Sequence, residues 1–359
     1  MKARGGAETL DGHCLAPSGT NQSWGSQFSG PRRRNTNMRP PPPDFVIVGA
    51  PRCATTAIYR TLREHKDLFL PCIKEPNHFA LEFGRRRAVE SSEDYARLFS
   101  TANKSQLRGE ASVMYLSSAE AIPTIVKRRP DVKLLAVVRN PVDLFISWHN
   151  QCVITLNEDI TDCEQAWHAQ AERTHRHMPY HQYREPLLLE YRRVCSEGRQ
   201  VKSMFALLPE DQRLVLVLDD LQTDPRKAYR QIVNFLGIRD DGRGLSRENG
   251  FSRVRSTAIA KLAQAVQTDP LLKRMRLRIK PLIARHELHF IEDVFRRNLL
   301  PAQKPKLRTE FRAELIREFT PDVRILAQAL DRDLSTWYRD APPAEGDLAS
   351  GLGDARQAS

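Results

Sequence analysis

With 359 residues, the chain is long enough for one large α/β domain, since such domains hold roughly 250 to 300 residues. The formal net charge of +12 favours anionic partners such as a nucleotide, an acidic glycan or a nucleic acid, although a solubilising surface would carry the same charge. Six cysteines without a Cys-x-x-Cys pair or a Cys/His cluster argue against a zinc centre and a disulfide framework, so we expect no metal and reduced thiols.

The two ends of the chain differ from its middle. Residues 1–43 are rich in Gly, Ser, Asn, Arg and Pro, a composition typical of disorder. They contain neither the apolar core of a signal peptide nor the stretch of about 18 apolar residues that spans a membrane. We therefore predict a disordered segment over residues 1–43, a single domain over 44–338, and a disordered tail over 339–359.

An apolar strand leads directly into a helix near the start of this domain. Residues 45–48 (FVIV) are the kind of run found in a strand buried on both faces. From residue 55 onward, apolar side chains recur at helical spacing. The short loop between strand and helix therefore opens onto a helix N-terminus, where free N–H groups and the helix dipole favour a bound anion.

This loop departs from the triphosphate-binding pattern G-x-x-x-x-G-K-[ST] at the lysine. Counted from Gly49, the second glycine position is Ala54, the lysine position is Thr55 and the hydroxyl position is Thr56. Arg52 supplies a cation earlier in the loop instead. The arrangement suits a nucleotide with one phosphate near the helix and a transferable anionic group beyond it.

The loop resembles the 5′-phosphosulfate-binding loop of sulfotransferases that use 3′-phosphoadenosine 5′-phosphosulfate (PAPS). In that family a lysine usually precedes Gly-Thr-Thr, whereas this chain has Arg52 and Ala54 at the lysine and glycine positions. The resemblance implies a P-loop-type parallel sheet flanked by helices, in a single sulfotransferase domain. It also implies that the 5′ end of PAPS is bound by Arg52, Cys53, Ala54, Thr55 and Thr56.

The segment KEPNHF, residues 74–79, resembles the Lys-Glu-Pro-x-x-Phe segment of bacterial sulfotransferases. The resemblance implies that Glu75 is the base that takes the proton of an acceptor hydroxyl as the new S–O bond forms. A surface Lys-Glu pair before a proline turn would show the same pattern. His78 is the alternative base, because cytosolic relatives use histidine, but the spacing favours Glu75.

A second strand and helix follow at residues 132–151. The apolar run 133–138 predicts another buried parallel strand, which ends in Arg139 where a kinase would often carry an aspartate for magnesium. Arg139 with Ser147, two helical turns further on, resembles the 3′-phosphate-binding element of PAPS enzymes, although a salt-bridged arginine and a packing serine would also fit. Because parallel strands end at one edge of a sheet, we expect both loops to share one cleft.

Further predictions depend on the resemblance. Glu110, in GEASVMYL, lies where the family lines its acceptor cleft, so we expect it to contact the substrate or orient the site. Trp167, in a polar region over residues 157–186, is a candidate for stacking on an acceptor sugar, with local packing as the alternative. Arg253 and Arg255 lie where relatives close a basic loop over the 3′-phosphate, although a solvated loop would also be basic.

The sequence thus predicts in-line transfer of a sulfuryl group from PAPS to an acceptor hydroxyl, with Glu75 as base and Arg52 neutralising the developing charge. The relatives favour a carbohydrate acceptor and leave a lipid or other metabolite hydroxyl open. Golgi-resident relatives carry a membrane anchor that we do not recognise here, so we expect a cytoplasmic location. The alternatives are a P-loop kinase of small metabolites, which would need magnesium and the missing lysine, and a nucleic-acid-binding protein, for which we find no reader motif.

Overall fold

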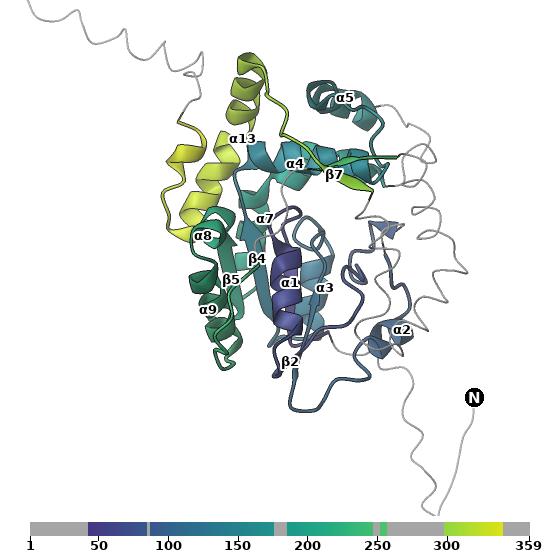
Figure 1. The fold of residues 1–359 in the computed structure, drawn as a ribbon, viewed down its shortest axis with the longest axis vertical. Coiled ribbons are helices and arrows are strands. Elements are labelled where there is room, and N and C mark those ends of the chain that lie inside the picture. Colours follow the sequence, from purple (N-terminus) through teal and green to yellow (C-terminus); the bar gives the residue numbers. More distant parts are fainter. Residues whose placement is uncertain (1–41, 85–86, 176–184, 247–251, 257–297, 340–359) are drawn as a thin grey trace, which may run out of the picture. The chain divides into compact units, whose positions relative to one another are not determined.

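The computed structural model describes residues 42–84, 87–175, 185–246, 252–256 and 298–339. Within these residues, five parallel strands form the main sheet in the order β2-β3-β1-β4-β5 (Figure 1). The strands are β1 (Phe45–Gly49), β2 (Leu68–Phe69), β3 (Leu107–Ala111), β4 (Lys133–Val138) and β5 (Arg213–Val217). This sheet confirms the predicted α/β fold. The segments predicted to be disordered lie outside the described residues, apart from Pro42, Pro43 and Arg339.

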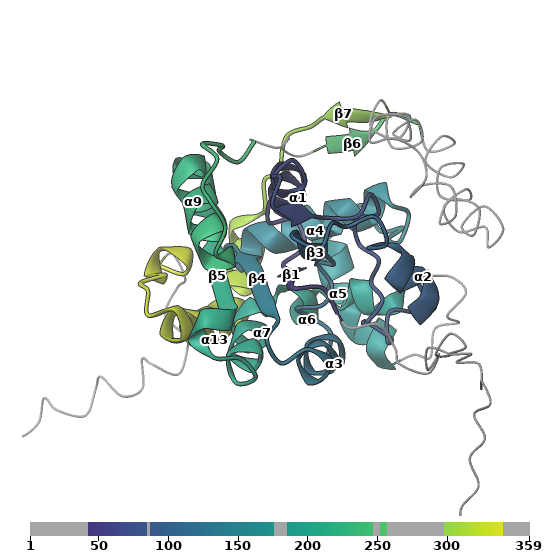
Figure 2. The same ribbon diagram turned by 90° about the horizontal axis from the view of Figure 1, so that it is seen from below.

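Helices cover both faces of the sheet. Figure 2 shows α1 (Thr55–Arg63) and α9 (Pro225–Leu236) on one face and α3 (Ala121–Arg128), α7 (Glu197–Phe205) and α13 (Thr309–Leu330) on the other. After β4, α4 (Pro141–Ile154) contacts α5 (Cys163–His175), α6 (Tyr191–Cys195) and α13. The other described elements are α2 (Ser92–Arg97), α8 (Leu218–Thr223), an antiparallel pair of β6 (Ser252–Val254) and β7 (Leu299–Pro301), and short 3₁₀ helices at Pro186–Leu189, Glu210–Gln212 and Ser335–Trp337. Of the described helices, none is long and apolar enough to cross a membrane.

The central strand β1 is buried on both faces, as its sequence predicts. Residues 45–48 are at most 1% exposed. Opposite Phe45, β3 carries Gly109, where a Cβ atom would lie 2.1 Å from the Phe45 ring. On its other edge β1 pairs with β4. The carboxyl ends of β1 and β4 are therefore neighbours, which brings the two predicted phosphate-binding loops to the same edge of the sheet.

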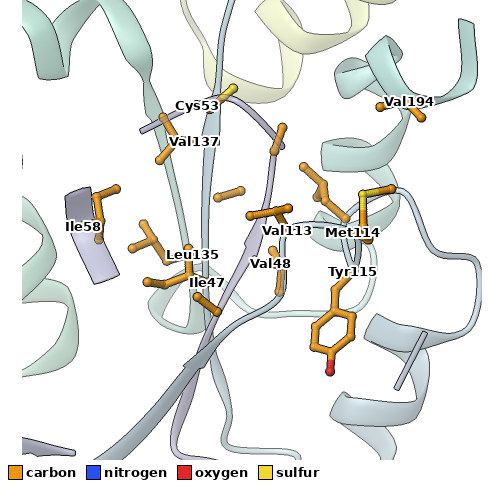
Figure 3. Close-up of a cluster of buried hydrophobic side chains, with 14 of the residues drawn as sticks. Ile47, Val48, Cys53, Ile58, Val113, Met114, Tyr115, Leu135, Val137 and Val194 are labelled. Carbon is orange, nitrogen blue, oxygen red and sulfur yellow. The ribbon is translucent and has the colours of Figure 1, made fainter. Parts of the chain in front are cut away.

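The core alternates along β1 in the manner of a strand packed on both sides. Figure 3 shows Ile47 on the same side as Ile58 of α1 and Leu135 of β4, whereas the next residue, Val48, points toward Val113. All five side chains are at most 5% exposed. The strand that carries the first loop is thus fixed by packing from both faces.

The N-terminus of α7 is anchored by α13. Asp322 of α13 is 4% exposed, and its carboxylate accepts the backbone N–H groups of Gly198 at 2.7 Å and Arg199 at 3.0 Å. A Cβ atom at residue 198 would lie 2.0 Å from the Asp322 carbonyl oxygen, so the close approach requires glycine. This contact places the preceding residue, Glu197, against the loop that follows β4.

Candidate active site

The β1–α1 loop, residues 50–54, is anchored to the sheet at its start and opens onto α1 at its end. The Ala50 N–H donates to the Val137 carbonyl at 2.8 Å. Arg52 and Ala54 adopt left-handed backbone conformations, with φ of 62° and 56°. At Ala54, the residue that caps α1, no side chain of a described residue bonds to the helix end. The first N–H groups of α1 are therefore available to an anion.

Two side chains of α4 hold the Arg52 guanidinium. Its Nε donates to Ser147 Oγ at 3.0 Å and its Nη1 donates to Gln151 Oε1 at 3.2 Å. Ser147 and Gln151 lie about one helical turn apart, so they present two acceptors to one planar group. The sequence predicts a pairing of Ser147 with Arg139. In the structure, the Ser147 hydroxyl instead accepts a hydrogen bond from Arg52 of the β1–α1 loop.

The loop after β4 contacts the β1–α1 loop through Arg139. Nη1 of Arg139 donates to the Arg52 carbonyl at 3.0 Å, and Nη2 lies 4.0 Å from Asp143 Oδ2. Asn140 caps α4, because its side-chain oxygen accepts the Val142 N–H at 2.9 Å. The two loops that the sequence assigns to one cleft are therefore in direct contact.

A cavity of about 640 Å³ lies over these two loops. Apolar side chains of Leu218, Leu221 and Leu245 line one part of it. A concave site that combines cations with apolar surface suits a ligand with phosphates and an aromatic base. The lining also includes seven residues that the sequence predicts to bind the donor: Arg52, Cys53, Ala54, Thr55, Thr56, Arg139 and Ser147.

Glu75 lines the same cavity from a strained segment between β2 and α2. Both Glu75 and Asn77 adopt left-handed backbone conformations, with φ of 60° and 50°. The Glu75 carboxylate lies 2.6 Å from the Lys74 ammonium, and its side chain is 36% exposed. Lys74, Glu75 and Asn77 all line the cavity. The Lys-Glu pair is thus partly exposed and lies at the cavity.

This segment is held in place by the chain that follows β3. Three of its backbone N–H groups donate to acceptors there: Glu75 to the Ala111 carbonyl at 2.8 Å, Asn77 to Ser112 Oγ at 3.0 Å, and Phe79 to Tyr115 Oη at 3.2 Å. The Ser112 and Tyr115 side chains are fully buried. These contacts explain how two left-handed residues persist so close together, because strained backbone needs support from its surroundings.

The chain that follows β3 forms a turn over residues 112–116, and this turn is also bonded to β1. The N–H groups of Ser112 and Leu116 donate to the carbonyls of Ile47 at 3.0 Å and Val48 at 2.8 Å. At Gly49 a Cβ atom would lie 2.7 Å from the Leu116 Cβ, so the turn approaches the start of the first loop closely. One turn therefore fixes the Glu75 segment relative to the β1–α1 loop.

Glu110 belongs to β3, just before this turn, and is not among the described residues that line the cavity. It is fully buried, and burial raises the pKa of its carboxyl to about 8, while the Tyr115 and Tyr95 hydroxyls oppose the rise. Of the two roles expected for Glu110, direct contact with a substrate does not fit this position. A role in orienting the site remains, since its neighbour Tyr115 holds the Phe79 N–H.

We expect the stability of Glu110→Gln to rise relative to that of the wild type as pH increases from 5 to 8. The folded carboxyl keeps its proton up to about pH 8, whereas the unfolded one loses it near 4.5, so wild-type stability falls across this interval and levels off above it. At about 1.4 kcal/mol per pKa unit, the wild type loses at most about 5 kcal/mol of its free energy of unfolding. Thermal unfolding at several pH values measures the difference, with Glu64→Gln, an exposed carboxylate, as control. A difference that does not change with pH would contradict this.

His78 and Trp167 are likewise not among the described residues that line the cavity. His78 is 5% exposed, its Nδ1 lies 3.1 Å from the Val89 carbonyl, and its ring stacks on Tyr95 with centroids 4.4 Å apart. Trp167 is fully buried, and its Nε1 donates to Glu314 Oε1 at 2.9 Å. The expectation that Trp167 stacks on a sugar is therefore corrected to local packing, and the position of His78 favours Glu75 as the base.

The basic loop predicted over residues 248–256 is described only from residue 252 onward. Arg253 lies in β6, and its side chain lies outside the described part of the structure. Arg255 is exposed, its backbone N–H donates to the Asn298 carbonyl at 2.7 Å, and it is not among the described residues of the cavity lining. A role of either arginine at the 3′-phosphate therefore remains a prediction.

The structure adds a cation that the sequence does not reveal. Lys304, which follows β7, lines the cavity, and its Nζ lies 3.2 Å from Asp143 Oδ1. The same carboxylate lies 4.0 Å from Arg139. Lys304 is 161 residues from Asp143 in the chain, so no local pattern could have indicated the contact.

The parallel sheet and the paired loops at its carboxyl edge place the cavity where α/β proteins of this architecture bind their ligands. A family model described as "Sulfotransferase domain" matches residues 42–269, which is more than half of the chain. The chain therefore belongs to the sulfotransferase-domain family, whose members use PAPS as the sulfuryl donor.

Individual relatives are distant. Heparan sulfate glucosamine 3-O-sulfotransferase 3B1 of Mus musculus is 24% identical over 258 residues, which cover 71% of this chain and 60% of the mouse protein. Carbohydrate sulfotransferase 15 of Rattus norvegicus is 22% identical over 245 residues, which cover 55% of this chain and 44% of the rat protein. A sulfotransferase structure from Alicyclobacillus acidocaldarius has a TM-score of 0.58 at 24% identity and covers 82% of this chain and 98% of its own. The chain thus spans at most 60% of the mammalian relatives, and the bacterial structure shares its fold.

Proposed function

We propose that this protein transfers a sulfuryl group from PAPS to an acceptor hydroxyl. The observation that carries the proposal is the contact of the two loops, Arg139 Nη1 to the Arg52 carbonyl at 3.0 Å, in a cavity that Glu75 also lines. A donor with phosphates on the 3′ and 5′ positions of one ribose needs two anion sites within one cavity. The family membership supports the same donor.

The lining residues fit such a donor by their chemistry. Arg52, the threonine hydroxyls at 55 and 56 and the free N–H groups of α1 would bind the 5′-phosphosulfate, because anions are favoured at a helix N-terminus. Arg139 offers a planar fork of donors to the 3′-phosphate. Lys304 supplies a third positive charge. The apolar lining formed by leucines 218, 221 and 245 would receive the adenine.

The transfer then needs one base and one source of positive charge. The Glu75 carboxylate would take the proton from the acceptor hydroxyl. At the same time the oxygen of that hydroxyl would bond to sulfur, and the bond between sulfur and the 5′-phosphate oxygen would break. Negative charge builds on that bridging oxygen, where the Arg52 guanidinium stabilises it. Ser147 and Gln151 hold the guanidinium in a fixed orientation, so little reorganisation accompanies the transfer.

A carbohydrate hydroxyl is the acceptor that we propose. The matched relatives from mouse and rat act on heparan sulfate glucosamine and on carbohydrate according to their names, which supports this class. Beside Glu75 the cavity lining carries Lys74 and Asn77, whose polar groups suit a hydroxyl-rich acceptor. Met114 and Val113 add apolar surface to the same cavity lining.

Calorimetric titration separates this proposal from its two alternatives. We expect the protein to bind adenosine 3′,5′-bisphosphate without magnesium and with at least about tenfold higher affinity than ATP with magnesium, because the kinase lysine is Thr55 here. A kinase would show the reverse order. A single-stranded oligonucleotide should bind weakly and lose its affinity steeply with salt. Transfer of label from ³⁵S-PAPS to a glucosamine oligosaccharide and to a simple phenol then tests the acceptor class.

A further inference from the structure

Glu197 is a buried carboxyl behind the two cationic loops. It is the first residue of α7 and is only 1% exposed. It is not among the described residues that line the cavity. A buried carboxyl next to an anion site is unexpected, because its charge would oppose the binding of phosphate.

The Glu197 carboxyl contacts both loops at once. Its Oε2 accepts the backbone N–H of Arg139 at 3.0 Å. Its Oε1 lies 3.8 Å from the Sγ atom of Cys53, which also lies 3.3 Å from the Pro51 carbonyl. One oxygen therefore touches the loop that carries Arg52, and the other touches the loop that carries Arg139.

The groups that face this carboxyl come from four elements. They are Cys53 in the β1–α1 loop, Arg139 after β4, Cys195 at the end of α6, and Asp322 of α13. Burial raises the pKa of both thiols well above 9, so they stay neutral. Burial also raises the pKa of Glu197 to about 8, with Asp322 adding to the rise and Arg139 opposing it. Around pH 8, the charge of Glu197 therefore changes, whereas the two thiols stay neutral.

We propose that Glu197 is a positioning residue that joins the two donor-binding loops and whose charge sets the affinity of the site for anions. The inference depends on the proposed function, because it assumes a donor with two phosphates. When the carboxyl is neutral, it still accepts the Arg139 N–H and leaves the cations unopposed. When it is ionised, it cancels part of their field. Affinity for the nucleotide therefore falls as pH rises through the titration of Glu197.

The coupling works in both directions. An anion bound at the two loops disfavours the ionised carboxyl and raises its pKa, so binding near pH 8.5 takes up a proton. A residue with a purely structural role would show no such uptake. Proton uptake is measured by titrating the nucleotide in buffers of different ionisation enthalpy.

The test measures the dissociation constant of adenosine 3′,5′-bisphosphate at pH 6.5, 7.5, 8.5 and 9.5. Glu197→Gln keeps the acceptor for the Arg139 N–H and loses the charge, so it should match the wild type at pH 6.5 and bind on the order of tenfold more tightly at pH 9.5. Glu197→Ala also loses the acceptor and should bind more weakly at every pH. Glu64→Gln removes an exposed carboxylate that is not among the described residues of the cavity lining, and it should keep the wild-type pH profile.

Two negative results have different meanings. If the wild type does not bind adenosine 3′,5′-bisphosphate at any pH, the proposed function fails. If the wild type binds but shares its pH profile with Glu197→Gln, or takes up no proton near pH 8.5, the role of Glu197 is refuted and the proposed function stands. The uptake measurement needs the wild type alone, so an absence of uptake refutes the role of Glu197 even if a variant does not fold.

Discussion

Replacing Glu75 by glutamine should lower kcat of sulfuryl transfer by about 10²- to 10⁴-fold, the contribution expected of a general base. The dissociation constant of adenosine 3′,5′-bisphosphate should change less than about threefold, because glutamine keeps the shape of the side chain and the donor loops are untouched. Single-turnover transfer from ³⁵S-PAPS measures the first quantity and calorimetry the second.

The matched control for this substitution is Glu64→Gln. Glu64 is a 74% exposed carboxylate paired with Arg243, and it is not among the described residues that line the cavity. It should keep wild-type kcat and nucleotide affinity. Weakened nucleotide binding with substantial residual turnover in Glu75→Gln would remove Glu75 from the role of base.

The second large effect is expected at Arg139. Arg139→Ala should weaken adenosine 3′,5′-bisphosphate roughly 10- to 100-fold, the range for a charge-assisted hydrogen-bonding group. Adenosine 5′-monophosphate, which lacks the 3′-phosphate, should lose less than about threefold. Calorimetry on both nucleotides measures the two ratios.

The comparison of two nucleotides matters because Arg139 also holds the other loop. Its Nη1 donates to the Arg52 carbonyl at 3.0 Å, so its loss could disturb the 5′ site instead. Equal losses for both nucleotides would support that indirect effect and reject the 3′-phosphate role. Arg213→Ala removes an arginine that donates to the Phe205 carbonyl, outside the described lining of the cavity, and should change neither affinity.

The parts of this site that follow from the sequence are those encoded over a few neighbouring residues. The apolar runs 45–48 and 133–138 specify buried strands, and the loops that follow them carry Arg52 and Arg139. Parallel pairing of β1 with β4 then places those loops at one edge, which the contact between Arg139 and Arg52 reflects. Local sequence patterns and the order of the strands are therefore sufficient to predict the two buried strands and the shared edge at which their loops lie.

The residues that escape prediction depend on distant partners. The polar composition around Trp167 favours exposure, yet its indole packs against Phe145 and Phe319 and donates to Glu314, 147 residues away. Glu197 and Lys304 carry no motif, and their partners Arg139 and Asp143 are 58 and 161 residues away. Which way such side chains face is decided by tertiary packing, to which a single sequence gives no access.

The turn at residues 112–116 has a consequence for how acceptors are chosen. Because this turn holds the main chain around Glu75, the carboxylate can move only through its own side-chain torsions, and an acceptor that fits would have to bring its hydroxyl within their reach. Selectivity would then depend on side chains of the cavity lining such as Lys74 and Met114, while Ser112 and Tyr115 remain the same. Redesign toward a new acceptor should therefore change side chains of the cavity lining and leave Ser112 and Tyr115 intact.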